Sequence, residues 1–215
     1  MIDFGIITAP RDPETLNFTI KSFRKQLWAH FDIFAEPGEY HIKHSDCNIY
    51  VNKENYGAFK NFNGAINKLL NRPGDMLCVL SDDLLFSSNT KNILLQIEEK
   101  YVQGEQFGYY ALFTNGTGNN AKDEIIKSGW TENRKGWHTW HGVFIMRKDI
   151  VRQIIEHPFY LNHLQSCDQQ IDACIGETVK LIGLPGYVHN PSVCSTIGIS
   201  TLGNIGIYDG LNFKL

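Results

Sequence analysis

Short apolar stretches alternate with amphipathic stretches through the first half of the chain. Apolar runs rich in β-branched and aromatic residues predict strands, whereas apolar residues three or four positions apart predict helices. This alternation favours an α/β fold, with a mostly parallel sheet and helices on both faces. The predicted strands cover residues 4–8, 31–36, 48–52, 76–81 and 107–113, and the predicted helices cover 13–28, 58–71 and 90–101.

The second half of the chain is less regular. Residues 116–135 are polar and rich in Gly and Asn, which predicts a long loop. From Pro185 onward the sequence has many Gly and Ser residues and little periodicity. A length of 215 residues fits one domain covering 1–215. The other predicted elements are a strand entered by 136–147, helices over 148–156 and 166–176, and a strand over 179–183.

Two adjacent carboxylates follow the apolar run Met76–Leu80. Asp82 and Asp83 come at the end of a predicted buried strand, and the chain turns apolar again directly afterwards. Two like charges side by side repel each other and are costly to bury, so they need a cation. Open α/β sheets bind ligands at the carboxyl ends of their strands, where a metal could hold a phosphate-bearing substrate. The alternative is a solvated turn in which one aspartate caps the next segment.

Composition narrows the class of protein. The hydrophobic fraction of 42% is sufficient for a core, and the net charge of −3 gives no overall positive field for nucleic acid. The first residues lack the basic region and long apolar core of a signal peptide, and no apolar run is long enough to span a membrane. The five cysteines are scattered without a CxxC pair. We therefore expect a cytoplasmic protein with no membrane partner.

Several common catalytic and nucleotide-binding motifs are absent from the sequence. There is no GxxxxGK[ST] phosphate-binding loop and no GxSxG nucleophile elbow. The segment starting at Gly116 matches GxGxxA and follows a predicted strand, but no clear helix begins with it. We interpret it as a flexible loop.

Two further segments carry candidate chemistry. Trp137, His138, Trp140 and His141 form an aromatic segment that could line a sugar or nucleoside site, because sugar rings often stack on Trp. Ordinary packing of the Trp side chains in the core is as good an interpretation. Asp168 lies at a predicted helix start, where an acidic first turn is favourable without any chemistry. From a helix start facing a cleft, however, a carboxylate could act as a general base.

The order of the elements resembles that of the GT-A fold glycosyltransferases, which use nucleotide sugars. The segment VLSDDLLFS resembles their DxD-type motif in its EDD form, with Ser81 at the first position. The resemblance implies that Asp83 binds a divalent cation, Mn²⁺ or Mg²⁺, and that Asp82 contacts the ribose or the metal. It also implies a nucleotide-sugar-binding half at 1–113 and an acceptor-binding half at 114–215, which includes the Trp-His segment.

Other segments resemble further parts of these enzymes more loosely. ITAPR resembles the donor-nucleotide loop, AEPGE a base-reading strand end, and NKENYGAFKNFNG the helix start beside the ribose. CDQQIDACI resembles the site of the catalytic Asp of inverting members, which places that role on Asp168. HNPSVCSTIGISTLG resembles a tail motif in which many members have a metal-binding His, but this chain has Thr196 there. The donor contacts implied by the resemblance are Thr8, Ala9, Pro10, Arg11, Glu36, Asn55, Gly57, Asn61, Ser81 and Asp82.

The resemblance implies transfer of a sugar from a nucleotide-diphosphate sugar to an acceptor hydroxyl, with inversion. The acceptor could be a glycan, a small molecule, a protein or a hydroxymethylated DNA base, as in some phage enzymes. The small size and the lack of an apparent membrane anchor suit a viral or bacterial enzyme. A DNA acceptor would need a basic rim, although charged loops are usually only solvated. Two other classes stay open: a nucleotidyltransferase, and a catalytically inactive carbohydrate-binding relative. The basic residues available for such a rim are Lys122, Lys127, Arg134 and Lys135.

Overall fold

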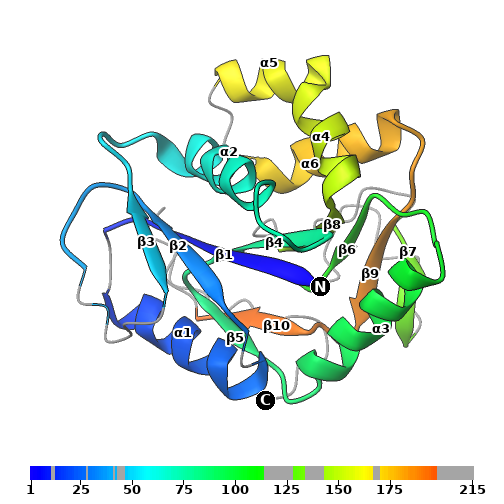
Figure 1. The fold of residues 1–215 in the computed structure, drawn as a ribbon, viewed down its shortest axis with the longest axis horizontal. Helices are drawn as coiled ribbons and strands as arrows, with labels where there is room; N and C mark the ends of the chain where they lie inside the picture. The colour runs from blue at the N-terminus through cyan, green and yellow to red at the C-terminus, as the bar shows by residue number, and fades with distance from the viewer. Residues whose placement is uncertain are drawn as a thin grey trace.

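A central sheet divides the molecule into two layers of helices (Figure 1). The computed structural model describes residues 1–10, 13–27, 29–40, 42, 47–113, 128–133, 143–166 and 170–197. Within these residues the sheet has eight strands in the order β3-β2-β1-β4-β8-β6-β9-β7. Its strands are β1 (Ile2–Thr8), β2 (Phe31–Ala35), β3 (Asn48–Val51), β4 (Met76–Ser81), β6 (Tyr109–Ala111), β7 (Gly129–Glu132), β8 (Phe144–Arg147) and β9 (Gly186–Asn190).

The strands of the first half run parallel, which confirms the predicted α/β class. β1 pairs in parallel with β2 on one side and with β4 on the other, and β3 continues the sheet beyond β2. β8 is antiparallel to both β4 and β6, so β6 and its parallel partner β9 again run in the direction of β4. The carboxyl ends of β1, β2, β4, β6 and β9 therefore lie at one edge of the sheet, called here the carboxyl edge.

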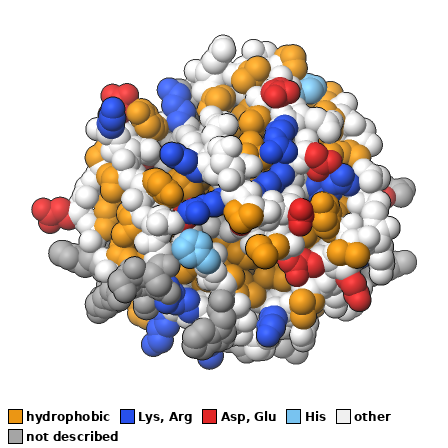
Figure 2. All heavy atoms as spheres, in the orientation of Figure 1, with side chains coloured by type: hydrophobic (Ala, Val, Ile, Leu, Met, Phe, Trp, Pro, Cys, Tyr) orange, Lys and Arg blue, Asp and Glu red, His pale blue; other side chains and the backbone are white. Residues whose placement is uncertain are grey.

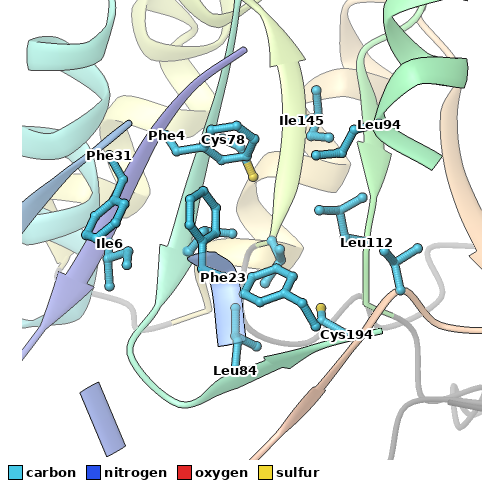
Figure 3. Close-up of a cluster of buried hydrophobic side chains, with 14 of the residues drawn as sticks. Phe4, Ile6, Phe23, Phe31, Cys78, Leu84, Leu94, Leu112, Ile145 and Cys194 are labelled. Atoms are coloured by element: carbon cyan, nitrogen blue, oxygen red, sulfur yellow. The ribbon is translucent and has the colours of Figure 1, made fainter. Parts of the chain in front are cut away.

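Each face of the sheet packs against its own set of elements. Helices α1 (Pro13–Leu27) and α3 (Thr90–Val102) cover one face, together with a two-stranded ribbon of β5 (Leu84–Phe86) and β10 (Cys194–Thr196). The core on this side is drawn in Figure 3, where Phe23 of α1 packs edge-on against Phe4 and Phe31. Phe23 also packs edge-on against Phe86. The other face is covered by α2 (Gly57–Leu69), α4 (Lys148–Glu156), α5 (Pro158–Ser166) and α6 (Ile171–Leu181).

Several predictions for the second half were wrong. β7 lies inside the predicted loop 116–135, and β9 and β10 lie in the tail that showed little periodicity. The predicted strand 179–183 is the end of α6 and the turn after it, because Val179 is buried on one helical face with Ile175. The helix predicted over 166–176 is likewise displaced, since α6 begins at Ile171 and a separate helix, α5, precedes it.

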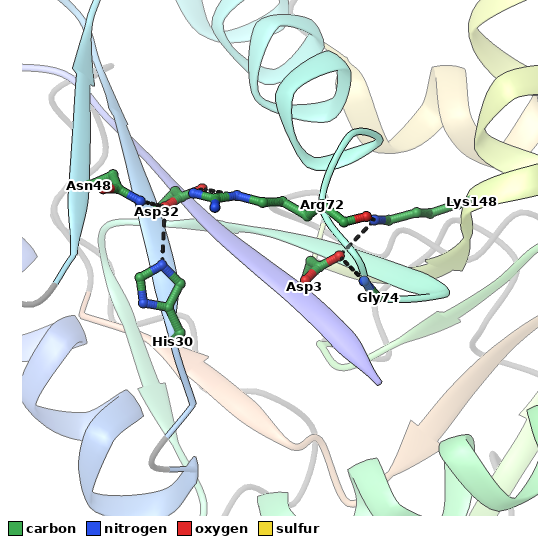
Figure 4. A network of polar contacts seen from close by, with 7 residues as sticks. All are labelled: Asp3, His30, Asp32, Asn48, Arg72, Gly74 and Lys148. Atoms are coloured by element: carbon green, nitrogen blue, oxygen red, sulfur yellow. Dashed lines mark hydrogen bonds and ion pairs between the residues drawn. The ribbon is translucent and has the colours of Figure 1, made fainter.

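A network of buried charges closes the opposite edge of the sheet, called here the amino edge (Figure 4). Asp32 of β2 accepts hydrogen bonds from the Arg72 guanidinium, with Nε at 3.0 Å, and from the Asn48 amide at 2.8 Å. Lys148 at the start of α4 donates to Asp3 of β1 at 2.6 Å. Asp32 is 1% exposed and Lys148 is 5% exposed, so both charges depend on their partners rather than on water. The network ties β1, β2, β3, α4 and the α2–β4 turn together.

The face of the molecule that is seen in Figure 2 carries charges of both signs. Figure 2 shows Lys, Arg, Asp and Glu side chains interspersed with apolar ones, without a continuous basic area among the described residues of that face. No helix within the described ranges is both long and apolar enough to cross a membrane.

Candidate active site

The two adjacent aspartates form the turn between β4 and β5 at the carboxyl edge. β4 is an apolar strand whose last residue is Ser81, and β5 begins again at Leu84. Asp82 is 1% exposed and Asp83 is 6% exposed, so this is a buried turn and not the solvated one that the sequence left open. The Ser81 hydroxyl donates to Asp83 Oδ1 at 2.6 Å, and the Thr8 hydroxyl at the end of β1 donates to Asp82 Oδ2.

The ribbon β5–β10 anchors this turn from the other side. β10 pairs antiparallel with β5, which sets Thr196 opposite Leu84. The next backbone N–H, of Ile197, donates to the carbonyl oxygen of Asp83 at 2.7 Å. Thr196 is therefore brought beside the aspartate turn, where the tail resemblance would put a metal-binding side chain. The Leu84 N–H in turn donates to Thr19 Oγ1 of α1 at 2.8 Å, which fixes the turn to the helix.

Glu36 follows directly after β2 at the same edge. Its side chain is 2% exposed, and its Oε2 accepts a hydrogen bond from the Tyr56 N–H at 2.9 Å. Oε1 is buried and has no hydrogen-bond partner among the described residues. A buried carboxylate oxygen without a donor is costly, so Glu36 is suited to accept a hydrogen bond from a ligand. Burial and, secondly, the charge of Glu36 raise the pKa of the nearby Tyr40, whose hydroxyl donates to the Glu36 carbonyl.

The start of α2 lies next to Glu36. Asn55 Oδ1 accepts from the Gly57 N–H at 3.0 Å, and Gly57 has a φ of 76°, a backbone conformation that favours glycine. Asn61 is 4% exposed and its amide donates to the Phe34 carbonyl at 3.1 Å, while its Oδ1 accepts from Asn52. The Asn61 side chain thus holds strand ends together, and Asn55 shapes the helix start.

The structure places only part of the predicted site. It brings Thr8, Glu36, Ser81, Asp82 and Asp83 to one edge of the sheet, as the carboxyl ends of β1, β2 and β4 require. Ala9 and the exposed Pro10 follow β1 at this edge. Sequence reasoning did not single out Tyr56, an exposed residue whose backbone N–H donates to Glu36. The predicted residues outside the described ranges are Arg11, Trp137, His138, Trp140, His141 and Asp168, with the basic residues Lys122, Lys127, Arg134 and Lys135.

The donor set suits a hard divalent cation. Asp82 and Asp83 offer carboxylate oxygens, which Mg²⁺ and Mn²⁺ prefer. Among the described residues, no three His, Cys, Asp or Glu side chains come close enough to enclose a metal. At phosphate sites, Mg²⁺ is commonly bound by one or two carboxylates together with water and the oxygens of a substrate.

The solved structures that resemble the chain include S. aureus TarS, with a TM-score of 0.57 and 11% identity, and GalNAc-T7 in complex with UDP, GalNAc and Mn²⁺, with a TM-score of 0.58 and 9% identity. The fold is that of the GT-A glycosyltransferases. The likeness covers 90% of this chain and 36% of TarS, and 87% of this chain and 42% of GalNAc-T7.

The GT-A likeness is one of fold. No known family model matches the sequence, and no curated protein matches it. The chain spans less than half the length of either structure, and a shared fold does not by itself determine an activity.

Proposed function

We propose that this protein is a glycosyltransferase that moves a sugar from a nucleotide-diphosphate sugar to an acceptor hydroxyl, with a divalent cation held by Asp83. One observation carries the proposal: two adjacent buried aspartates end the strand β4 at the carboxyl edge, beside the ends of β1 and β2. GalNAc-T7, which shares the fold, binds UDP, GalNAc and Mn²⁺.

The donor nucleotide would lie along the ends of β1 and β2. Glu36 Oε1, which lacks a donor among the described residues, would accept a hydrogen bond from an N–H of the base. Tyr56, beside it, offers an exposed aromatic ring on which a base can stack. Asp82, fixed by the Thr8 hydroxyl, would contact the ribose, and Arg11 would approach the diphosphate.

The aspartate turn would hold the diphosphate end of the donor. A divalent cation supplies charge stabilisation for the departing diphosphate when it is bound. The Ser81 hydroxyl donates to Oδ1 of Asp83, and the Asp83 carboxylate would hold the cation. The Ile197 N–H fixes the backbone of this turn, so Asp83 needs little rearrangement to bind.

The residues proposed for the acceptor site are those that the resemblance to GT-A glycosyltransferases implies. Asp168 would take the proton of the attacking hydroxyl, which gives inversion at the anomeric carbon. Trp137, His138, Trp140 and His141 would line the acceptor, a glycan, a small molecule or a hydroxymethylated base in DNA.

A screen of common nucleotide sugars, with and without Mn²⁺, tests the proposal. Release of sugar to water that requires the metal is the expected result. Binding of a nucleotide sugar without turnover would instead support an inactive carbohydrate-binding protein. Release of pyrophosphate from a nucleoside triphosphate would overturn the proposal in favour of a nucleotidyltransferase.

A further inference from the structure

Two aromatic side chains face each other across β7 and β9. The register of these antiparallel strands sets Trp130 directly opposite His189, so both rings lie on the same side of the sheet. Their ring centroids are 4.8 Å apart and the rings cross at 72°. His189 is 6% exposed. The pair is therefore a fixed feature of the folded chain on the side that carries the β5–β10 ribbon.

In His189, the hydrogen bond made by Nδ1 determines whether Nε2 carries a hydrogen. Nδ1 lies 2.7 Å from the carbonyl oxygen of Pro191, and a carbonyl only accepts, so Nδ1 carries the hydrogen. Burial lowers the pKa of His189, which favours the neutral ring. Nε2 is then a hydrogen-bond acceptor, and no hydrogen bond to it occurs within the described part of the chain.

The indole of Trp130 presents the complementary group. Its Nε1–H is buried and has no hydrogen-bond partner among the residues that the structure describes. Buried donors without partners are rare, and each one calls for a specific explanation. An unsatisfied donor and an unsatisfied acceptor on two adjoining rings complement a hydroxyl group, which both donates and accepts.

The sheet register locates this pair relative to the aspartate turn. The strand pairings align Cys78 of β4, Tyr187 of β9 and Glu132 of β7 in one row across the sheet. On the same three strands, Leu80, His189 and Trp130 each lie two residues closer to the carboxyl edge than that row. Between β4 and β9 there are three strand spacings, which amount to about 14 Å. The pairs that define the row are Cys78–Ile145, Ile145–Tyr110, Tyr110–Tyr187 and Tyr187–Glu132.

The distance between His189 and the aspartate turn decides whether His189 could be the general base or could only contact a remote part of the acceptor. A general base must come within hydrogen-bond reach, about 3 Å, of the attacking hydroxyl, which meets the sugar next to the diphosphate. His189 is too far along the sheet from Asp83 for that role. A hydroxyl on a remote part of the acceptor can reach it.

We propose that Trp130 and His189 form an acceptor subsite that recognises a hydroxyl of a carbohydrate. The hydroxyl donates to Nε2 of His189 and accepts from Nε1–H of Trp130. A phosphodiester has no hydrogen to donate and would leave Nε2 unsatisfied, so the pair favours a sugar hydroxyl over the phosphate backbone of a nucleic acid. The inference rests on the proposed glycosyl transfer, because it assigns the acceptor class of that reaction.

Calorimetric titration with methyl α-D-glucopyranoside, methyl β-D-galactopyranoside and maltose, in the presence of UDP and Mn²⁺, tests the subsite. At least one of these probes should bind the natural protein. Trp130→Phe and His189→Phe, which keep an aromatic ring but lose the nitrogens, should each weaken that binding about five-fold, the value of one hydrogen bond. Thermal unfolding of both variants checks that they are folded.

Thr131→Val is the matched control. Its hydroxyl is also buried without a partner among the described residues, but it lies on the opposite side of β7. This variant should bind the probes as the natural protein does. Equal weakening by Thr131→Val, no effect of the other two changes, or no binding of any probe would each overturn the subsite.

The two proposals fail in distinguishable ways. Metal-dependent release of sugar from a donor, without probe binding that depends on Trp130 and His189, would retain the transferase and remove the subsite. Probe binding that depends on the pair, without any donor turnover, would retain the subsite on a protein that only binds carbohydrate.

Discussion

The carboxylates at the two edges of the sheet differ in their partners. At the amino edge, Asp32 and Asp3 are neutralised by Arg72 and Lys148 within the chain. At the carboxyl edge, Asp83 accepts from a serine hydroxyl, and no ion pair to it occurs within the described residues. The first arrangement is complete in the isolated protein, whereas the second gains from a cation supplied by solvent or substrate. The same side-chain chemistry thus stabilises the fold at one edge and, in the proposed function, binds a cation at the other.

The largest effect should come from Asp83→Asn. The amide keeps the shape of the side chain but loses the charge, so we expect donor turnover in Mn²⁺ to fall by about 10²–10³-fold. Stability to unfolding should stay the same or rise, because a buried carboxylate with no cation partner in the described chain is removed. Turnover assays and urea unfolding measure the two quantities.

Asp75→Asn is the matched control for that change. Its carboxylate is half exposed at the amino edge, where it pairs with the terminal amine. This variant should keep full turnover. Full turnover in Asp83→Asn as well would remove the metal argument and the contrast between the edges.

Lys148→Met should have the next largest effect, on stability. The methionine fills similar space but leaves the partly buried Asp3 without its cation, which should cost about 3 kcal/mol in the free energy of unfolding. Adding Asp3→Asn to the same chain should recover part of the loss, since the uncompensated charge is then gone. Urea unfolding of the single and double variants measures this. An additive double variant would mean that the charges do not act as a pair.

Glu36→Gln should slightly raise the free energy of unfolding, whereas Lys148→Met lowers it. Gln can still accept from the Tyr56 N–H, and it replaces a buried carboxylate that has one oxygen without a donor. We expect a change in the free energy of unfolding of no more than about 1 kcal/mol, and weaker binding of the donor nucleotide. Asp32→Asn, at the amino edge, should destabilise the chain more. Equal losses in the two variants would erase the difference between the edges.

The smallest effect concerns pH at the carboxyl edge. Burial lowers the pKa of His189, so the unfolded chain binds a proton more readily than the folded chain. The contribution of His189 to stability is present above its ordinary pKa, about 6.5, and is lost as pH falls below it. Unfolding free energies measured from pH 7 to pH 5 should fall less steeply in His189→Phe. An unchanged slope would show that His189 does not titrate differently on folding.

The sequence was a good guide where hydrophobic periodicity was strong. The apolar runs that became β1, β2 and β4, and the helical spacing in α1, α2 and α3, correctly predicted the parallel half of the sheet. β7, β9 and β10 were missed because they are short and partly polar, and they exist through pairing with distant strands. Val179 and its neighbours read as a strand because of their β-branched side chains, but the packing of α6 against the sheet prevailed over that local preference.

The candidate site could be predicted in part for the same reason. Asp82, Asp83 and Glu36 stand at the ends of strongly apolar strands, so their place at the carboxyl edge followed from the order of the elements. The facing of Trp130 and His189 depends on the register between two strands that the sequence did not predict. The approach of Thr196 to Asp83 depends likewise on the pairing of β10 with β5. Local patterns carry no information on such registers.

The β5–β10 ribbon has a consequence for the order of events during synthesis of the protein. β5 leaves the ribosome long before β10, yet the backbone of the aspartate turn is completed only by the N–H of Ile197. The parallel strands β1, β2 and β4 can form while the rest of the chain is still being made, because their contacts are closer in sequence. Asp82 and Asp83 then reach their final geometry only when residues 194–197 dock, so the proposed cation site would be completed late in folding.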